Sequence, residues 1–284
     1  MRIAIVGLGL IGGSLALKLT EQGYTVFGLS RSPLTCEQAL ARGAVQECGT
    51  ELAQLQAFHP QLVLICTPLE QVLPTLTALL PHLPAATVVS DVGSIKQPIV
   101  EPATQQWPWF VGGHPMAGKT TQGIQAAEAD LFVGRPYVLT PIAETRPQAL
   151  ETLQSLIAAV GAESVLTDPA RHDRAVAWIS HLPVMISASL IASVSQEVDP
   201  LILELAHTLA SSGFRDTSRV GGGIPQLGVE MARHNREAVL ASLRSYQQHL
   251  QQIETWIEKR NWDKLSQFLE QTQRDWRQFP VNQP

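Results

Sequence analysis

The chain has 284 residues, of which 45% are hydrophobic and 16% charged, and its formal net charge is −5. This length allows two domains with full cores, and the negative balance argues against general nucleic-acid binding. Because Lys18, Glu21, the prolines and the glycines interrupt the apolar runs, we expect no membrane-spanning segment. Cys36, Cys48 and Cys66 lack the paired spacing of metal ligands and cannot all join in disulfides. We therefore expect no metal site and a reducing, cytoplasmic setting.

The N-terminal segment predicts a dinucleotide-binding unit. An apolar run at residues 3–6 precedes the sequence Gly7, Leu8, Gly9, Leu10, Ile11 and Gly12. Gly7 allows a tight turn, Gly9 lets the backbone approach a pyrophosphate, and Gly12 lets the following helix pack closely on the strand. Leu10 and Ile11 fall in the first turn of that helix, whose free N–H groups face the phosphates. A secretory signal also begins with a basic residue and an apolar stretch, but the glycines and the missing cleavage site disfavour it.

The end of the second predicted strand, residues 25–29, carries information about the cofactor. An NAD-selective site usually places Asp or Glu there to bind a ribose hydroxyl, whereas this chain has Ser30, Arg31 and Ser32. The Arg31 guanidinium offers a charge-assisted fork to a phosphate, and the two serine hydroxyls add donors. The segment therefore predicts NADP as the cofactor, recognised through its 2′-phosphate.

Short apolar runs alternate with helical stretches through the first part of the chain. The predicted strands are residues 2–6, 25–29, 62–66, 87–91, 109–111, 136–140 and 164–167. Continuous apolar strands between helices are typical of a parallel sheet that is buried on both faces. Residues 1–168 are therefore predicted to form a doubly wound, Rossmann-type α/β domain.

Two of these strands end in polar residues that could meet a ligand. Thr67 and Pro68 follow one strand, and Ser94 follows the next. In open parallel sheets, ligands bind beyond the carboxyl ends of the strands. Thr67 and Pro68 are candidates for the edge of the cofactor site, and an ordinary strand-ending turn explains them equally well. Ser94 can donate a hydrogen bond at the mouth of the cleft.

His114 lies in the sequence Gly112-Gly113-His114-Pro115, which we expect to form a loop after the strand at 109–111. Such a histidine does not cover an apolar face. Its ordinary pKa of about 6.5 lets it exchange a proton near neutral pH. A histidine that only satisfies backbone groups of the turn is the alternative.

After Asp168 no strand-like run appears, and residues 169–284 are predicted to form an all-helical domain. The stretch 178–195 is apolar nearly all round, so we expect it to be buried on every side. Residues 235–259 predict a helix with a seam at Val239, Leu243, Tyr246, Leu250, Ile253 and Ile257. That seam fits an intramolecular core helix and a subunit interface equally well. Dimerisation would bury the excess apolar surface.

Two polar clusters interrupt the helical half. The first contains His172 and His181, each beside other polar residues. The second contains Arg215 and Arg219, just before a run of glycines. Arginine beside a flexible segment suits capture of a small carboxylate, because the guanidinium fork matches carboxylate geometry. The alternative is a surface loop in which Arg215 pairs with Asp216.

Six motifs in order give the chain a family resemblance. They are Gly7-x-Gly9-x-x-Gly12, Cys66-Thr67-Pro68, Asp91-Val92-Gly93-Ser94, Gly113-His114-Pro115-Met116-Ala117-Gly118, Ser180-His181-Leu182-Pro183 and Phe214-Arg215-Asp216-x-x-Arg219. Over essentially its whole length the chain resembles the prephenate/arogenate dehydrogenase family of tyrosine biosynthesis. The resemblance implies a nucleotide-binding domain joined to a helical domain that forms a homodimer, with a small-molecule substrate held between them.

The resemblance also implies an oxidative decarboxylation and roles for single residues. Hydride leaves the carbinol carbon of a cyclohexadienyl ring, the ring carboxylate departs as carbon dioxide, and a phenol results. His114 would accept the proton of the substrate hydroxyl, and Ser94 would orient that hydroxyl or the histidine. Arg219 would bind a substrate carboxylate, with Arg215, His172 and His181 as further substrate contacts.

One departure from the family pattern bears on the substrate. Members that use prephenate often carry a second histidine after the His-Leu-Pro sequence, where this chain has Val184. Together with Ser30 and Arg31, this resembles the branch that oxidises arogenate with NADP. Prephenate is the alternative substrate. A related β-hydroxyacid reductase is disfavoured because the helical half has only Lys259 and Lys264 to serve as its lysine. A non-catalytic NADP sensor is disfavoured because His114, Ser94 and Arg219 occur together.

Overall fold

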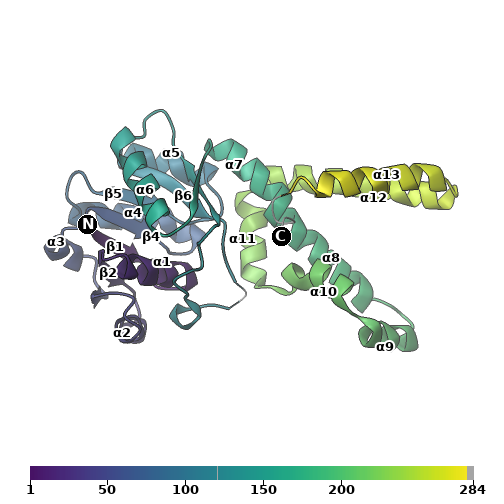
Figure 1. Ribbon diagram of the computed structural model, residues 1–284, viewed down its shortest axis with the longest axis horizontal. Helices are drawn as coiled ribbons and strands as arrows, with labels where there is room; N and C mark the ends of the chain where they lie inside the picture. The colour runs from purple at the N-terminus through teal and green to yellow at the C-terminus, as the bar shows by residue number, and fades with distance from the viewer. Residues whose placement is uncertain (120, 280–284) are drawn as a thin grey trace. The chain divides into compact units, whose positions relative to one another are not determined.

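The computed structural model describes residues 1–119 and 121–279 (Figure 1). The chain divides into two compact units, Met1–Arg236 and Glu237–Pro284, and each is described by itself. Within the described residues, the first unit contains an eight-stranded sheet of order β3-β2-β1-β4-β5-β6-β7-β8. Its strands are β1 (Arg2–Val6), β2 (Thr25–Leu29), β3 (Glu47–Gly49), β4 (Leu62–Ile65), β5 (Val88–Asp91), β6 (Phe110–Pro115), β7 (Pro136–Thr140) and β8 (Glu163–Leu166).

Helices cover both faces of this sheet. They are α1 (Leu10–Glu21), α2 (Pro33–Ala41), α3 (Gln54–Phe58), α4 (Val72–Leu79), α5 (Gln97–Gln106) and α6 (Pro147–Ala159), with short 3₁₀ turns at Leu69–Gln71, Leu80–His82 and Ile124–Ala126. Successive residues of β1 enter opposite cores, since Ile3 and Ile5 join one buried cluster and Ala4 and Val6 join the other. This alternation confirms the predicted doubly wound α/β fold.

The sheet differs from the prediction in three ways. Strands β1 to β6 are parallel, but β7 runs antiparallel to β6, and β8 is parallel to β7. Strand β3 was not predicted, because Glu47–Gly49 is short and lacks a run of β-branched residues. The predicted loop around His114 is wrong, since His114 lies within β6 and pairs with Val138.

The glycines before His114 explain why β6 extends so far. A side chain at Gly113 would come within 2.7 Å of the Asp91 carbonyl oxygen, and one at Gly112 would come within 2.5 Å of Val100. Only glycine lets β6 pass this close to its neighbours. The same residues that suggested a loop therefore let the strand run on to Pro115.

A series of helices follows the sheet. They are α7 (Pro169–Val176), a π-helical turn at Ala177–His181, α8 (Leu182–Ser195), α9 (Pro200–Leu209), α10 (Ser212–Ser218), a 3₁₀ turn at Arg219–Gly222 and α11 (Pro225–His234). The last strand ends at Leu166, which agrees with the predicted change from α/β to helical structure. The domain boundary between residues 168 and 169 stays a prediction.

Two expectations about these helices are wrong. The prolines do not break them, because Pro183 follows the π-helical turn in the first turn of α8, and Pro169–Ser195 forms one continuous helix. That helix is long and apolar enough to cross a membrane by length and composition alone. Nor is the stretch buried on every side, since Leu182 and Ser187 are the buried residues of α8.

The second unit consists, over its described part, of α12 (Arg236–Glu258) and α13 (Trp262–Trp276). Asn261 caps α13, and Trp256 and His249 of α12 contact the ring of Phe268 in α13. Helix α12 confirms the helix predicted at 235–259. Leu250 and Ile257 of its seam are about half exposed in the single chain, at 47% and 50%.

Candidate functional site

The glycine turn after β1 has the shape that a dinucleotide needs. Gly7 has a φ of +101°, and a side chain there would come within 2.6 Å of the Cys66 carbonyl oxygen. A side chain at Gly12 would collide with the Gly7 carbonyl oxygen, whereas one at Gly9 would meet open space. The turn thus requires glycine at two positions and leaves room for a pyrophosphate at the third. Helix α1 begins at Leu10 without a side-chain cap, so the N–H groups of Leu10 and Ile11 are available to that anion.

Hydrogen bonds hold both ends of the segment 30–32, which follows β2, and leave the side chain of Arg31 exposed. The Ser30 N–H donates to the Gly49 carbonyl oxygen at 3.1 Å, and the Ser32 hydroxyl accepts from the Thr35 N–H at 3.3 Å to cap α2. Arg31 between them is exposed, and no carboxylate among the described residues pairs with it. Its guanidinium is therefore free to bind an anion.

Thr67 and Pro68 lie directly after β4, beside the glycine turn. The Thr67 hydroxyl is buried, and it has no hydrogen-bond partner in residues 1–119 and 121–279. A buried hydroxyl without a partner is costly, which makes Thr67 a candidate ligand contact. Pro68 is exposed.

His114 stands at the end of a hydrogen-bonded chain of three side chains. Its Nδ1 lies 2.8 Å from Nε2 of His172, and Nδ1 of His172 lies 2.7 Å from Oδ1 of Asp173. The two imidazole rings meet edge to face, with their centroids 5.1 Å apart. The structure therefore brings together two predicted site residues, one from the sheet and one from α7.

When both rings are neutral, the order of this chain indicates which nitrogens carry protons. A carboxylate only accepts, so His172 donates from Nδ1 to Asp173, and its Nε2 in the neutral ring accepts. His114 then donates from Nδ1 to His172. The lone pair on Nε2 of His114 is left free to accept a proton, as a general base requires.

Asp173 is anchored to the loop before α5. Its Oδ1 accepts from the Lys96 N–H and its Oδ2 from the Gln97 N–H, both at 2.8 Å. Asn235 donates from its side-chain amide to the Asp173 carbonyl oxygen at 2.7 Å. Asp173 therefore holds His172 at a fixed place above the sheet edge.

Asp91, at the end of β5, organises the other side of the site. Its carboxylate accepts from the Gly93 N–H at 2.9 Å and from the Gly113 N–H at 3.2 Å, and it pairs with the ammonium of Lys96. Lys96 also donates to the Gly113 carbonyl oxygen at 2.8 Å. Both charged side chains are fully buried, and this burial lowers the pKa of Lys96. One carboxylate thereby fixes the residues that precede Ser94 and His114.

Burial also controls the charge of His114. It lowers the pKa of His114 well below 6.5, and the neighbouring His172, Lys96 and His181 lower it further. His114 is therefore neutral near pH 7, which is the form that accepts a proton.

His181, at the end of the π-helical turn, is also neutral. Burial lowers its pKa to about 4. The Asn235 side-chain amide lies 3.2 Å from Nδ1 of His181, which therefore accepts and leaves the proton on Nε2. This Nε2 is buried and has no partner within the part of the chain that the structure describes. It can donate a hydrogen bond to a ligand.

The predicted arginines stand apart from this network. Arg215 pairs with Asp216 at 3.0 Å, and both side chains are exposed, as in the alternative reading of that loop. Arg219 is exposed in the turn Arg219–Gly222. No hydrogen bond or ion pair within the described residues joins Arg219, Arg215 or Ser94 to His114.

Sequence reasoning missed four residues of this network. Asp91 begins the motif that ends at Ser94, Lys96 follows that motif, and Asp173 adjoins His172, so their positions carried a signal. Asn235 follows α11 with no sequence cue to a site. Its role follows from the fold alone.

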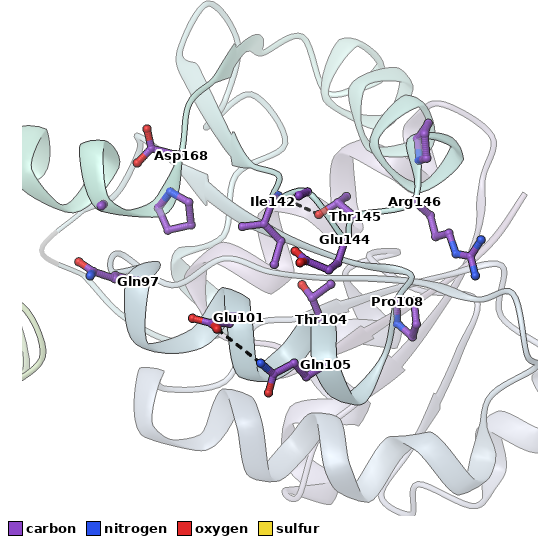
Figure 2. A pocket seen from close by; sticks show the side chains of 14 residues that line it. Gln97, Glu101, Thr104, Gln105, Pro108, Ile142, Glu144, Thr145, Arg146 and Asp168 are labelled. Atoms are coloured by element: carbon purple, nitrogen blue, oxygen red, sulfur yellow. Dashed lines mark hydrogen bonds between the residues drawn. The ribbon is translucent and has the colours of Figure 1, made fainter.

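A cavity of about 820 Å³ lies elsewhere, beside α5, α6 and the start of α7 (Figure 2). Glu101, Glu144, Arg146 and Asp168 are among its lining residues, and none of its lining residues was predicted as a site residue. The described residues contain no group of three or more His, Cys, Asp or Glu side chains that could hold a metal ion.

Comparisons with known proteins agree with this arrangement. The family model for the prephenate dehydrogenase nucleotide-binding domain matches residues 15–166, and that for its dimerization domain matches residues 168–271. The chain is 33% identical to the prephenate dehydrogenase of Bacillus subtilis over an alignment of 290 positions, which covers 99% of this chain and 76% of that protein.

Solved structures agree as well. Synechocystis arogenate dehydrogenase matches with a TM-score of 0.87 and 51% identity, over 97% of this chain and 98% of that chain. Prephenate dehydrogenase from Aquifex aeolicus, in complex with hydroxyphenyl propionate and NAD+, matches with a TM-score of 0.91, over 97% and 96% of the two chains. At 24% identity, the second likeness shows the fold alone.

The buried neutral state of His181 makes stability depend on pH. Its pKa of about 4 in the folded chain is below the unfolded value of about 6.5, so the unfolded chain binds more protons between these values. We expect the free energy of unfolding to fall as the pH is lowered through this window, by about 3 kcal/mol from His181 alone. Urea unfolding across this range measures the slope.

The variant His181→Gln should have a shallower slope, and the exposed control His249→Gln should match the wild type. If the free energy of unfolding depends on pH equally in the wild type and in His181→Gln, the low pKa assigned to His181 is wrong.

Proposed function

Because the chain belongs to the prephenate dehydrogenase family, we propose that it converts L-arogenate to L-tyrosine by oxidative decarboxylation, with NADP as the hydride acceptor. Family membership supports a dehydrogenase that acts on arogenate or prephenate. Two residues favour arogenate with NADP. Arg31 stands where an NAD site has a carboxylate, and Val184 stands where prephenate-using members often carry histidine. The 51% identity to Synechocystis arogenate dehydrogenase supports the same choice.

The residues around the glycine turn fit NADP. Gly7, Gly9 and Gly12 would shape the pyrophosphate cradle, with the N–H groups of Leu10 and Ile11 as donors. The 2′-phosphate would bind to Ser30, Arg31 and Ser32, and Thr67 and Pro68 would border the site. When bound, NADP supplies the acceptor for the hydride that leaves the carbinol carbon.

The observation that carries the proposed mechanism is the chain from Asp173 through His172 to His114. Nε2 of His114 takes the proton of the substrate hydroxyl as hydride leaves the same carbon. His172 accepts from Nδ1–H of His114 and, with the Asp173 carboxylate behind it, keeps the proton on Nδ1 and Nε2 available to the substrate. The bond to the ring carboxylate then breaks to release carbon dioxide, its electrons complete the aromatic ring, and His114 returns the proton to the phenol oxygen.

Other residues would hold the substrate. We assign Arg219 to a substrate carboxylate, with Arg215 beside it, because guanidinium binds carboxylate through two parallel hydrogen bonds. His181 would donate from its free Nε2–H, and Ser94 would orient the substrate hydroxyl. His172 acts through His114 and is a positioning residue.

We further propose that the helical domain, residues 169–284, joins two copies of the chain, and that residues 1–168 bind the nucleotide. In the first unit, Leu201, Ile202, Leu205 and Leu209 of α9 are exposed by 52% to 74%. Contiguous apolar surface of this kind marks an interaction site. A second copy is the proposed occupant, consistent with the match to a dimerization domain, and the dimer is expected in the cytoplasm without nucleic-acid or membrane partners.

The first prediction concerns substrate and cofactor. With purified protein, initial rates of reduced-cofactor formation should be high for arogenate with NADP and low for prephenate or for NAD. Arg31→Ala should reduce the preference for NADP over NAD by about tenfold to a hundredfold, because a charge-assisted contact is lost. Arg277→Ala, at an exposed arginine of the second unit, should leave that preference unchanged.

Comparable rates with prephenate would overturn the substrate assignment and keep the reaction. No turnover with any pair would favour the non-catalytic sensor.

The second prediction concerns proton transfer. His114→Asn should lower kcat by about 10²- to 10⁴-fold while cofactor binding persists, since a positioned base is removed. His172→Asn should lower kcat less and move the acid limb of kcat/KM to higher pH, because the His172 ring contributes to the low pKa of His114. In the wild type, that limb should lie below pH 6.5. An unchanged pH profile in His172→Asn would show that His172 is only structural.

The third prediction concerns assembly. Leu205→Glu should convert the dimer to a monomer, because a charge placed in an apolar interface is costly to desolvate. Light scattering after size-exclusion chromatography measures the mass. Leu34→Glu, at a 61% exposed position on α2, is the matched control and should stay dimeric. A monomeric wild type, or a dimeric Leu205→Glu, would contradict the proposed interface.

A further inference from the structure

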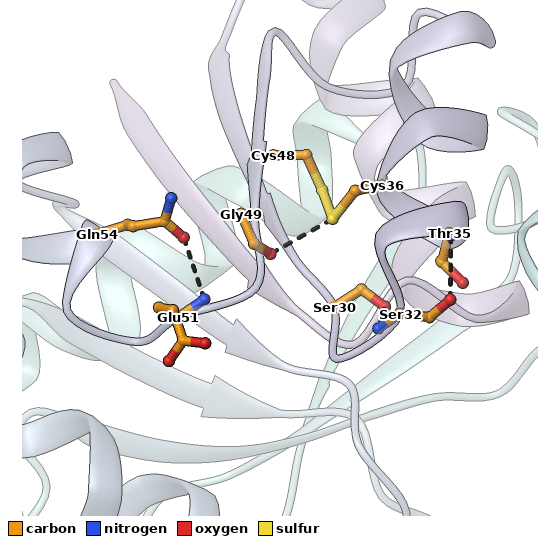
Figure 3. Close-up of a disulfide and its surroundings, with 8 residues drawn as sticks. All are labelled: Ser30, Ser32, Thr35, Cys36, Cys48, Gly49, Glu51 and Gln54. Carbon is orange, nitrogen blue, oxygen red and sulfur yellow. Dashed lines mark hydrogen bonds between the residues drawn. A yellow bond between two sulfur atoms is a disulfide. The ribbon is translucent and has the colours of Figure 1, made fainter.

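A disulfide links the two elements that flank the proposed 2′-phosphate segment. Cys36 of α2 and Cys48 of β3 are bonded, with their Cα atoms 5.5 Å apart and a sequence separation of 12 (Figure 3). This pairing was not predicted from the sequence. Cys66 stays a free thiol, and burial raises its pKa, so it is a poor partner for exchange.

Both anchors of Arg31 depend on the bonded elements. Ser30 donates its N–H to the carbonyl of Gly49, the residue after Cys48. Ser32 caps α2 one turn before Cys36, and its carbonyl accepts from the Cys36 N–H at 3.2 Å. The disulfide therefore ties together the two supports that hold Arg31 between them.

Noncovalent packing at this edge of the sheet is thin. Strand β3 is an edge strand of three residues, Glu47–Gly49, and it pairs only with β2 among the described strands. Helix α2 buries only Cys36 and Ala39. With so little apolar contact, a covalent link contributes a large share of the constraint on the relative position of β3 and α2.

The two cysteine residues differ in exposure. Cys36 is buried, with 7% of its surface exposed, and its sulfur lies 3.3 Å from the Gly49 carbonyl oxygen. Cys48 is half-buried. An incoming thiolate therefore reaches the Cys48 sulfur more readily, and after cleavage the Cys36 thiol is placed to donate to Gly49.

We propose that Cys36 and Cys48 form a reversible redox site that tunes recognition of the 2′-phosphate, an inference that rests on the proposed use of NADP. A dithiol reductant attacks Cys48, the bond between the sulfurs breaks, and Cys36 leaves as a thiolate and takes up a proton. The second thiol of the reductant attacks the mixed disulfide, releasing the Cys48 thiol and the oxidised reductant. Two electrons pass to the protein.

Reduction loosens the supports of Ser30 and Ser32 and leaves the glycine turn and His114 untouched. The oxidised protein should therefore bind NADP more tightly than the reduced protein. NAD lacks the 2′-phosphate, so its binding should not change. In a reducing compartment, a protein disulfide is usually transient and serves catalysis or redox sensing.

The test measures dissociation constants of NADP and NAD by calorimetry on the full chain, equilibrated with oxidised or reduced dithiothreitol. Alkylation and mass spectrometry count the thiols. Reduction should weaken NADP binding about tenfold, or about 1.4 kcal/mol, and leave NAD binding unchanged. The double variant Cys36→Ser and Cys48→Ser should bind NADP as weakly as the reduced wild type, and its dissociation constant should be the same in oxidised and reduced dithiothreitol. Cys66→Ala should keep the response.

Three results would overturn the inference. One is a pair that never oxidises, and another is a pair that oxidises with equal NADP affinity in both states. Both leave the NADP assignment standing if NADP still binds more tightly than NAD. The third is a protein that prefers NAD in both states, which overturns the NADP assignment as well. The dissociation constants of the oxidised and the reduced wild type distinguish these results even if the double variant does not fold.

Discussion

The site depends on one buried carboxylate. Asp91 binds the backbone N–H groups of Gly93 and Gly113 and the ammonium of Lys96, so three donors from the loop before α5 and from β6 meet at a single charge. Such a pair is costly to bury unless its hydrogen-bonding capacity is filled, and here the neighbouring backbone fills it. These bonds fix the backbone of Gly93 and Gly113, the residues directly before Ser94 and His114. Precise placement of reacting groups of this kind requires support beneath them.

The second constraint runs from α7 to the sheet. Asp173 accepts hydrogen bonds from the backbone of Lys96 and Gln97 and from His172. His172 in turn is hydrogen-bonded to His114. The hydrogen bonds that orient His114 therefore also attach α7 to the sheet edge. Burial keeps His114 and His181 neutral, and it leaves the hydroxyls of Thr67 and Tyr137 without partners among the described residues. A buried polar atom without a partner in the described part of the chain, such as Nε2 of His181, is a candidate for contact with a ligand.

Stability is distributed unevenly across this molecule. The central strands contribute side chains to two buried cores. The edge strand β3 has only three residues, and a disulfide joins it to α2. The proposed proton transfer at His114 lies in the central sheet, and the proposed recognition of the 2′-phosphate lies at its β3 edge. A loosely packed edge can change its constraints without disturbing the centre, since local stability follows local packing.

The sequence by itself determined the features that depend on neighbouring residues. Glycine spacing predicted the turn, apolar runs predicted most strands, and a seam predicted α12, because turns and periodicity follow from local backbone and side-chain preferences. Ordered motifs identified the family. The tertiary structure decided that His114 lies in a strand, that it meets His172 from 58 residues away, and that Asn235 reaches His181. It also decided that Cys36 meets Cys48. These contacts depend on strand register and helix placement, which arise only when distant segments pack together.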